Sequence, residues 1–331
     1  MKQIVIIALC LSLSSCEFLW LKPQNDPSPT QIFDEAWNFA NEEYSFFEFK
    51  GIDWDDVYNR YSPLVSDEMT EVELFDLLAD MLFELRDGHV NLSSTFDISR
   101  NSTWYLDSDP NFNYDVLERN YFNGEQRFAS GFVVMDFGDV GYIRYSSFTR
   151  TINEAVLDEL LTDFQDKNGL IIDVRNNGGG STLNGDRFVG HIIDQRYNFG
   201  DIRYKNGPGR NDFSAPQPIT RSPRGDTSYT KPIVLLTNRS SYSATNTFTL
   251  MMSQLPNVTV IGDTTGGGGG YPANMELSNG WNLRVSSSIS TMPNGFNVED
   301  GIPPDIRIDL DSALLYNGID AILERALSEL R

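Results

Sequence analysis

Hydrophobic residues follow two different periods along the chain, and the first is helical. Between residues 31 and 95 they recur at helical spacing in two sets: Ile32, Phe33, Ala36, Trp37, Phe39 and Ala40, and then Val72, Leu74, Phe75, Leu77, Leu78, Met81, Leu82 and Leu85. This spacing places apolar side chains on one face of a helix. Thr70, three residues before Glu73, has the spacing of a capping box. The pattern predicts a small N-terminal helical domain over 31–95.

The second period belongs to an alternation of short apolar runs and amphipathic stretches over 131–331. A polar, aromatic and aperiodic connection at 96–130 precedes it. The expected strands are 131–137, 141–145, 170–174, 233–237 and 258–261, and the expected helices are 152–166, 183–194, 244–255 and 318–330. Such alternation predicts an α/β fold with a mostly parallel, helix-covered sheet. Residues 200–230 are rich in Gly, Pro, Arg, Asn and Ser, which predicts a long surface loop or lid.

The N-terminal segment has the layout of an export signal. Residues 1–15 carry one Lys, a short apolar run and then small residues, which is typical of a secretory signal peptide. The run Leu13-Ser14-Ser15-Cys16 resembles a bacterial lipobox, in which Cys16 carries the lipid. Residues 16–30, rich in Pro and polar residues, then predict a tether. We expect a lipid-anchored protein of the bacterial cell envelope, on the periplasmic or cell-surface side; the alternative is an ordinary signal peptide with an incidental cysteine.

Charge and composition exclude several classes of function. The 331 residues include 47 acids and 25 bases, for a net charge of −22. A nucleic-acid partner needs a basic surface, so none is expected. Two cysteines cannot build a disulfide framework, and two histidines leave little room for a multi-histidine metal centre. No metal or organic cofactor is expected, and the acidic charge would steer a basic peptide toward the protein.

Three stretches carry candidate chemistry. His89 directly follows Gly88 at the exit of an apolar helix, and the strand 170–174 runs into the glycine turn 178–180. The backbone N–H groups of such a turn can bind an oxyanion. Ser243 lies where a buried strand turns into a helix, exposed to the positive end of the helix dipole. Each has a structural alternative: Ser243 as a simple N-cap, the glycines as a tight turn, and His89 as a core histidine.

Six segments occur together in an order that identifies a family. They are L-R-D-G-H-V at 85–90, G-Y-I-R-Y-S-S-F at 141–148, L-I-I-D-V-R-N-N-G-G-G at 170–180, Y-S-A-T-N at 242–246, V-I-G-D-T-T-G-G at 260–267 and G-I-P-P-D-I at 301–306. This set resembles the tail-specific, or C-terminal processing, serine peptidases, a group that includes the core of the tricorn protease and the interphotoreceptor retinoid-binding protein repeats. The resemblance implies a crotonase-like (ClpP-like) spiral core over 131–331. The gap between 92 and 141 is too short for the PDZ domain that many members carry.

The resemblance also implies the catalytic residues. Ser243 matches the nucleophile and His89 the histidine of the tricorn-like branch, which acts as the base. Glu299 is the best match for the acid, with its neighbour Asp300 as an open alternative. Members with a Ser/Lys dyad carry a lysine about 25 residues after the serine, but Gly268 stands there. A Ser/Lys mechanism is therefore not expected.

Further site expectations concern backbone groups. The N–H of Ala244, with that of Gly178 or Gly179, would form the oxyanion hole. The glycine run 266–270 lacks the Lys-Ser/Thr of a phosphate loop and is interpreted as a flexible wall of the cleft. His191, beside two isoleucines in an amphipathic stretch, is expected to be structural.

These features predict a membrane-anchored serine endopeptidase that hydrolyses exported proteins or peptides. Without a PDZ domain, substrate choice would depend on the cleft, the 96–130 connection and the 200–230 loop. The alternative is a non-catalytic binder of peptides or lipophilic ligands on the same scaffold. The sequence does not define the cleavage specificity or the oligomeric state.

Overall fold

A computed structural model describes residues 26–100, 107–225 and 228–331. Its centre is a seven-stranded sheet in the order β14-β10-β9-β6-β5-β4-β3, in which β5, β6, β9, β10 and β14 are parallel. The strands are β3 (Arg127–Ala129), β4 (Phe132–Asp136), β5 (Val140–Tyr145), β6 (Gly169–Asp173), β9 (Ile233–Thr237), β10 (Val258–Gly262) and β14 (Ile306–Arg307). The predicted α/β class is confirmed, with every expected strand present.

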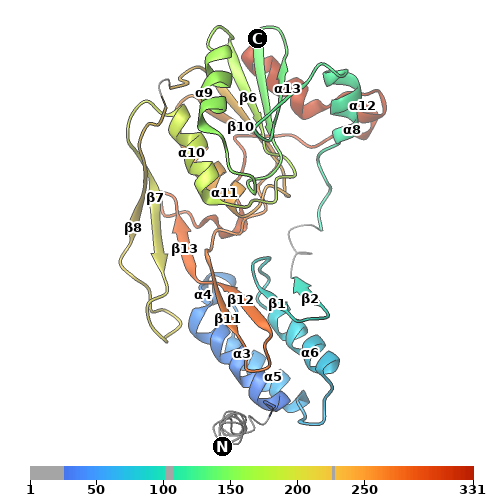
Figure 1. Ribbon diagram of the computed structural model, residues 1–331, viewed down its shortest axis with the longest axis vertical. Coiled ribbons are helices and arrows are strands. Elements are labelled where there is room, and N and C mark those ends of the chain that lie inside the picture. Colours follow the sequence, from blue (N-terminus) through green and yellow to red (C-terminus); the bar gives the residue numbers. More distant parts are fainter. Residues whose placement is uncertain (1–25, 101–106, 226–227) are drawn as a thin grey trace, which may run out of the picture.

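Helices cover both faces of this sheet, as Figure 1 shows. The helices α9, α10 and α11 pack on one face and α13 packs on the other. Alternate residues of one strand supply the two cores: Ile172 of β6 faces the first set of helices, and Ile171 faces α13. The helices are α9 (Glu154–Asp163), α10 (Thr182–Ile192), α11 (Ala244–Met252) and α13 (Ala321–Leu330), with the shorter α8 (Tyr114–Val116), η2 (Leu117–Phe122) and α12 (Ser312–Tyr316).

The N-terminal region is helical, as predicted, but it also contains a sheet. Its helices are α3 (Pro29–Glu43), α4 (Phe47–Lys50), α5 (Trp54–Tyr61), η1 (Ser62–Leu64) and α6 (Glu71–Phe83), and the Thr70–Glu73 capping box is formed. A four-stranded sheet packs against them in the order β11-β12-β1-β2. Its strands are β1 (Asn91–Ser93), β2 (Ile98–Arg100), β11 (Pro272–Glu276) and β12 (Asn282–Ser286). Two of these strands therefore come from the distant 272–286 segment.

The expectation of loops at 200–230 and 96–130 is wrong in part. Residues Tyr197–Tyr204 (β7) and Gln217–Arg221 (β8) pair as antiparallel strands, and Ser288–Thr291 (β13) adds a third strand. Pairing satisfies the backbone groups of these polar segments, whose composition alone suggested a loop. The turn between β7 and β8 reaches the N-terminal helices, where Arg210 contacts Asp55 at 2.7 Å. The 96–130 connection likewise contains β2, α8, η2 and β3.

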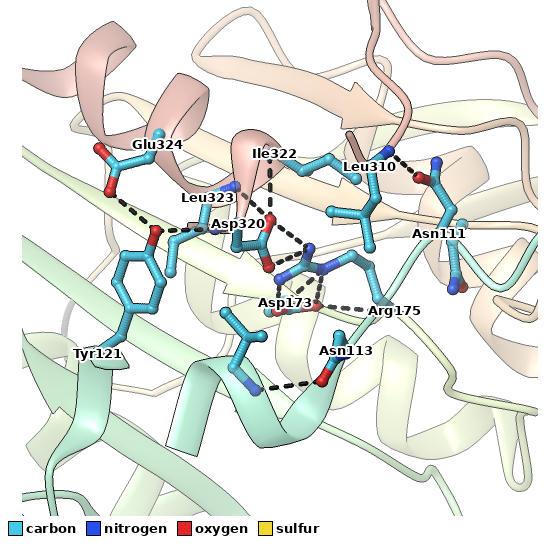
Figure 2. A network of polar contacts seen from close by, with 12 residues as sticks. Asn111, Asn113, Tyr121, Asp173, Arg175, Leu310, Asp320, Ile322, Leu323 and Glu324 are labelled. Atoms are coloured by element: carbon cyan, nitrogen blue, oxygen red, sulfur yellow. Dashed lines mark hydrogen bonds and ion pairs between the residues drawn. The ribbon is translucent and has the colours of Figure 1, made fainter. Parts of the chain in front are cut away.

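A buried ion-pair network fixes the end of β6 (Figure 2). The guanidinium of Arg175 lies 2.7 Å from Asp173 and 2.9 Å from Asp320, and all three side chains are almost fully buried. Asp320 also caps α13 through the N–H groups of Ile322 and Leu323. The network thus ties the C-terminal helix to the strand that leads into the glycine turn. Among the described residues, no helix is long and apolar enough to cross a membrane.

Candidate active site

Ser243 occupies a strained turn between β9 and α11. Its backbone has φ 60° and ψ −119°, a region that residues other than glycine rarely adopt. The turn is held by hydrogen bonds on both sides: the Ser243 N–H donates to Gly267 O at 2.9 Å, and the Tyr242 N–H donates to Asn177 O at 3.0 Å. The Ser243 side chain makes no capping hydrogen bond to α11. The alternative that it is only an N-cap is therefore wrong.

The Ser243 hydroxyl instead lies 2.8 Å from His89 Nε2. His89 belongs to the turn that follows α6, so the contact joins the N-terminal region to the α/β core. The His89 N–H donates to Asp87 Oδ1 at 2.7 Å, which fixes this turn. The structure thus brings together two side chains that are 154 positions apart in the sequence.

The environment keeps His89 uncharged. Burial lowers its pKa to about 4, with the charge of Asp87 opposing this shift and that of Arg284 adding to it. A neutral imidazole can accept a proton from a hydroxyl, which a protonated one cannot. A backbone hydrogen bond to Gly270 acts with Asp87 in favour of the protonated form, but burial outweighs both.

Glu299 is buried beside this pair but does not hydrogen-bond to His89. It lies in the short helix η3 (Val298–Asp300), and its Oε1 accepts from Lys50 Nζ at 2.7 Å while Oε2 accepts from the Gly269 N–H at 2.9 Å. Burial and the nearby Asp87 raise the pKa of Glu299 to about 8. Asp300, the alternative acid, has an exposed side chain. Of the two acids, only Glu299 faces the interior of the site.

Sequence reasoning missed two charged groups at the site. Lys50, from α4, is buried against Glu299, and although burial opposes its charge, Glu299 and Asp87 raise its pKa. Nothing local in the sequence links Lys50 to Glu299, 249 positions away. Asp87 stands inside the quoted motif at 85–90. An Asp side chain commonly accepts a hydrogen bond from the backbone N–H two residues further on, as Asp87 does from His89. That spacing was the one signal available for it.

The glycine turn lies directly against the nucleophile. A Cβ atom on Gly179 would stand 2.7 Å from Tyr242 O and 2.9 Å from Ser243 Cβ, so no larger residue fits there. The Gly179 N–H already donates to Asn177 Oδ1 at 3.0 Å, whereas Gly178 faces open space and lines the groove. Ala244 begins α11, where backbone N–H groups lack intrahelical partners. Ala244 and Gly178 are thus the better-placed pair of oxyanion donors.

Two hollows flank Ser243. The larger groove, about 660 Å³, is lined by Gly88, His89, Asn91, Ser93, Ile98, Arg100, Gly178, Gly180, Tyr242, Ser243, Asn274, Asn282 and Arg284. The smaller, about 380 Å³, includes Gly268, Gly269 and Gly270 in its wall. The glycine run 266–270 is therefore a wall of the cleft, held in place by hydrogen bonds to Glu299 and Ser241. Among the described residues, no cluster of three or more His, Cys, Asp or Glu side chains could hold a metal ion.

The remaining predicted residues lie elsewhere. His191 is buried between α9 and α10, with Nδ1 2.7 Å from Asp158 Oδ1 and Nε2 3.2 Å from Glu154 Oε2. It is not among the residues that line the groove. Cys16, the signal 1–15 and most of the tether lie outside the described residues.

The fold and the site together define a class. An α/β core presents a serine at a strained strand–helix turn, in contact with an uncharged histidine and beside free backbone N–H groups, which is the arrangement of a serine hydrolase. The family model "Peptidase family S41" matches residues 139–308, and "Tricorn protease C1 domain" matches 26–83. The chain belongs to peptidase family S41, a family of serine-type peptidases, as the sequence motifs predicted.

Individual relatives agree with this assignment. The chain is 29% identical to a carboxy-terminal-processing protease of Bartonella bacilliformis over 202 residues, which cover 59% of this chain and 44% of that protein. The chain thus spans less than half the length of the curated relatives it matches. A crystal structure from Parabacteroides merdae, described as a candidate peptidase, is 43% identical with a TM-score of 0.88, covering 92% of this chain and 97% of the other. Mature CPAF (13% identity, TM-score 0.66, coverage 92% and 96%) shares the fold.

Proposed function

We propose that this chain is a serine endopeptidase in which Ser243 is the nucleophile and His89 the general base. The observation that carries the proposal is the 2.8 Å contact between the Ser243 hydroxyl and His89 Nε2, with the histidine buried and uncharged. We propose that it hydrolyses peptide bonds in exported proteins or peptides. No metal takes part in this mechanism.

The geometry supports a two-step acyl transfer. Ser243 Oγ attacks the scissile carbonyl while His89 Nε2 takes its proton, and the imidazolium then returns the proton to the leaving amine. A water molecule activated by the same imidazole hydrolyses the acyl-enzyme. The N–H groups of Ala244 and Gly178 bind the oxyanion, each contributing about 3–4 kcal/mol to the transition state.

Two acidic residues support His89 during this reaction. Asp87 raises the proton affinity of His89 through its charge and fixes the turn that carries it. Glu299 acts less directly, through an intervening water or hydroxyl, because Lys50 and Gly269 already occupy its two oxygens. We propose Glu299 as the third member of the site and Asp87 as a residue that positions the histidine.

Cleavage of a peptide library, read by mass spectrometry, tests the proposal. The wild type is expected to generate defined new termini, and Ser243→Ala is expected to generate none. Ser253→Ala is the matched control, since Ser253 lies at the other end of α11 and bonds only to a backbone carbonyl within that helix. Full activity in Ser243→Ala would show that the nucleophile is assigned wrongly.

The competing proposal is a binder without catalysis, and it rests on Gly268 standing where a dyad lysine would be. Such a protein would retain peptides with measurable affinity and return them intact. Recovery of intact peptide from complexes with the wild type would favour this alternative.

We also propose that the protein is anchored to the bacterial envelope through lipid on Cys16. The support is the Leu13-Ser14-Ser15-Cys16 pattern after a signal-like segment. Metabolic labelling with a palmitate analogue should mark the wild type and not Cys16→Ala. Labelling that persists in the variant would contradict the anchor.

A further inference from the structure

One face of the four-stranded sheet carries a row of polar side chains. Direct cross-strand pairs run Asn274 with Arg284, Arg284 with Asn91, and Asn91 with Arg100. Directly opposed residues in antiparallel strands project from the same face, so these four side chains form one row across β11, β12, β1 and β2. The next row contains Leu92 and is buried against the N-terminal helices.

This row lines the groove beside Ser243. All four of its residues contribute to the groove wall, and Arg284 also lines the smaller hollow on the other side of the serine. The ionisable side chains among the described lining residues are those of His89, Arg100, Tyr242 and Arg284, and none is a carboxylate. The charge of the buried Asp87 also acts on Arg284, although Asp87 does not line the groove. The chain as a whole is acidic, with a net charge of −22, whereas this groove has two guanidinium groups and no lining acid and is therefore locally basic.

The guanidinium of Arg284 is also incompletely satisfied. Its Nε atom is buried and has no hydrogen-bond partner among the described residues. Other arginines of the chain form ion pairs with carboxylates, as Arg210 does with Asp55. A buried donor without an acceptor is costly, and a ligand that supplies an acceptor removes that cost.

We propose that Arg284 and Arg100 form a subsite that binds a carboxylate of the peptide substrate. The inference rests on the proposed peptidase function and names its preferred substrate class. A carboxylate matches the fork of N–H donors on a guanidinium, and the amide of Asn274 adds donors to the same row. The Asn91 amide already donates one N–H to His89 O at 2.8 Å, which leaves it one further donor. The carboxylate can come from an Asp or Glu side chain or from the end of the substrate chain. The net charge would favour basic peptides at a distance, whereas this groove selects an acidic group on contact.

The test compares peptides that differ only in one charge. Each Glu-containing peptide is paired with its Gln twin, and each free C-terminal acid with its amide. For the wild type, we expect kcat/KM for the carboxylate peptide to exceed that of its neutral twin by about 10- to 100-fold, as a hydrogen-bonded charge pair would give. The pair that shows the larger ratio identifies the source of the carboxylate.

Variants of the two arginines test the assignment. In Arg284→Gln and Arg100→Gln the ratio is expected to fall toward one, and in Arg100→Glu a Lys-containing peptide should overtake its Glu twin. Arg100 is exposed, so its variants keep the assay informative if Arg284→Gln does not fold. Arg119→Gln, an exposed arginine on η2, makes the same charge change away from the groove and should leave the ratio at its wild-type value.

The outcomes separate this subsite from the proposed function. Hydrolysis with no carboxylate preference, or a preference that survives in both arginine variants, overturns the subsite and leaves the peptidase intact. If no peptide is hydrolysed, the peptidase proposal fails, and the affinities of the same peptide pairs for the protein decide the subsite. Equal affinity for the Glu and Gln peptides, and for the acid and amide, would then overturn it.

Discussion

Two buried clusters of charge in this molecule are built from similar groups, but they differ in whether every buried polar atom has a partner. At the end of β6, Arg175 bridges Asp173 and Asp320, and each of its three guanidinium nitrogens has a carboxylate partner. At the candidate active site, Lys50 is paired with Glu299, but Asp87 Oδ2 is buried with no hydrogen-bond partner among the described residues. The first cluster is saturated, and the second is not.

The pKa shifts of the two clusters have opposite signs. Burial alone would raise the pKa of Asp173, but Arg175 and Arg144 overcome it and hold the pKa below its ordinary value. Burial and Asp87 raise the pKa of Glu299 to about 8 in spite of Lys50. A saturated cluster holds fixed charges and stabilises the fold, whereas an unsaturated one can take up and release protons. This difference separates a structural ion-pair network from a site of proton transfer.

The two histidines provide the largest expected contrast. His89→Asn removes the proposed base, so peptide hydrolysis should fall on the order of 10⁴-fold or more, with little change in stability. His191→Asn breaks buried contacts to two carboxylates, so it should lower the free energy of unfolding and spare the catalytic step. Steady-state kinetics and denaturant unfolding on both variants test this. Substantial hydrolysis by His89→Asn would remove the distinction between the histidines.

Removing the cation from each cluster should cost different amounts of stability. Arg175→Met leaves two buried carboxylates unpaired and is expected to lower the free energy of unfolding by roughly 3–5 kcal/mol. Lys50→Met should cost less, because Glu299, with its pKa near 8, is already largely protonated at pH 7 and leaves little unpaired charge. Urea unfolding at pH 7 measures both values. Equal losses would show that the two clusters are not different in kind.

A single-charge change in the saturated cluster should have a smaller effect. Asp320→Asn keeps an oxygen that can cap α13 and leaves Arg175 paired with Asp173, so we expect a loss of about 1–3 kcal/mol. Thermal unfolding and peptide hydrolysis should show lower stability with the site intact. A collapse of activity without loss of stability would instead place this network in the reaction.

The last effect concerns pH and is the smallest when counted per pH unit. Because the folded-state pKa of Glu299 lies above its unfolded value of about 4.5, its contribution to stability is fully present below that value and declines as pH rises toward about 8. The stability of the wild type relative to Glu299→Gln should therefore fall across this window, by at most about 1.4 kcal/mol per pH unit. Asp173 has the opposite sign, and its contribution is lost as pH falls through its lowered pKa. A difference between the two proteins that stays constant from pH 5 to 8 would contradict the raised pKa.

The sequence predicted the helices and strands that follow from a local hydrophobic period. It predicted few of the contacts that depend on pairing between distant segments. Buried strands such as β6 and β9 are short apolar runs, and their positions were predicted within a few residues. The strands β7 and β8 were missed because Gly, Pro, Arg, Asn and Ser dominate the 200–230 segment, although Phe199 and Ile202 of β7 lie in the core. The strands β11 and β12 were not expected to complete the sheet beneath the N-terminal helices, because β12 pairs with the distant β1.

The candidate site likewise contains residues with a local sequence signal and residues whose role depends on long-range contacts. The pairing of Ser243 with His89 came from a family resemblance and not from any local pattern, since 154 positions separate them. Lys50 and Arg284 have no local signal for a role, because it is their long-range neighbours that give them one. Asp87 was visible in its motif and was overlooked.

The rate at which a fluorophosphonate probe modifies Ser243, followed against pH by peptide mapping, tests the Ser243–His89 pair most directly. The wild type should react at Ser243 with a rate that is constant down to about pH 5 and then falls with an apparent pKa near 4, well below the ordinary histidine value. His89→Ala, shown to be folded, should react at least about 1,000-fold more slowly. Absence of modification in the wild type, or equal rates in the two proteins, would contradict the assignment of Ser243 as a nucleophile activated by His89.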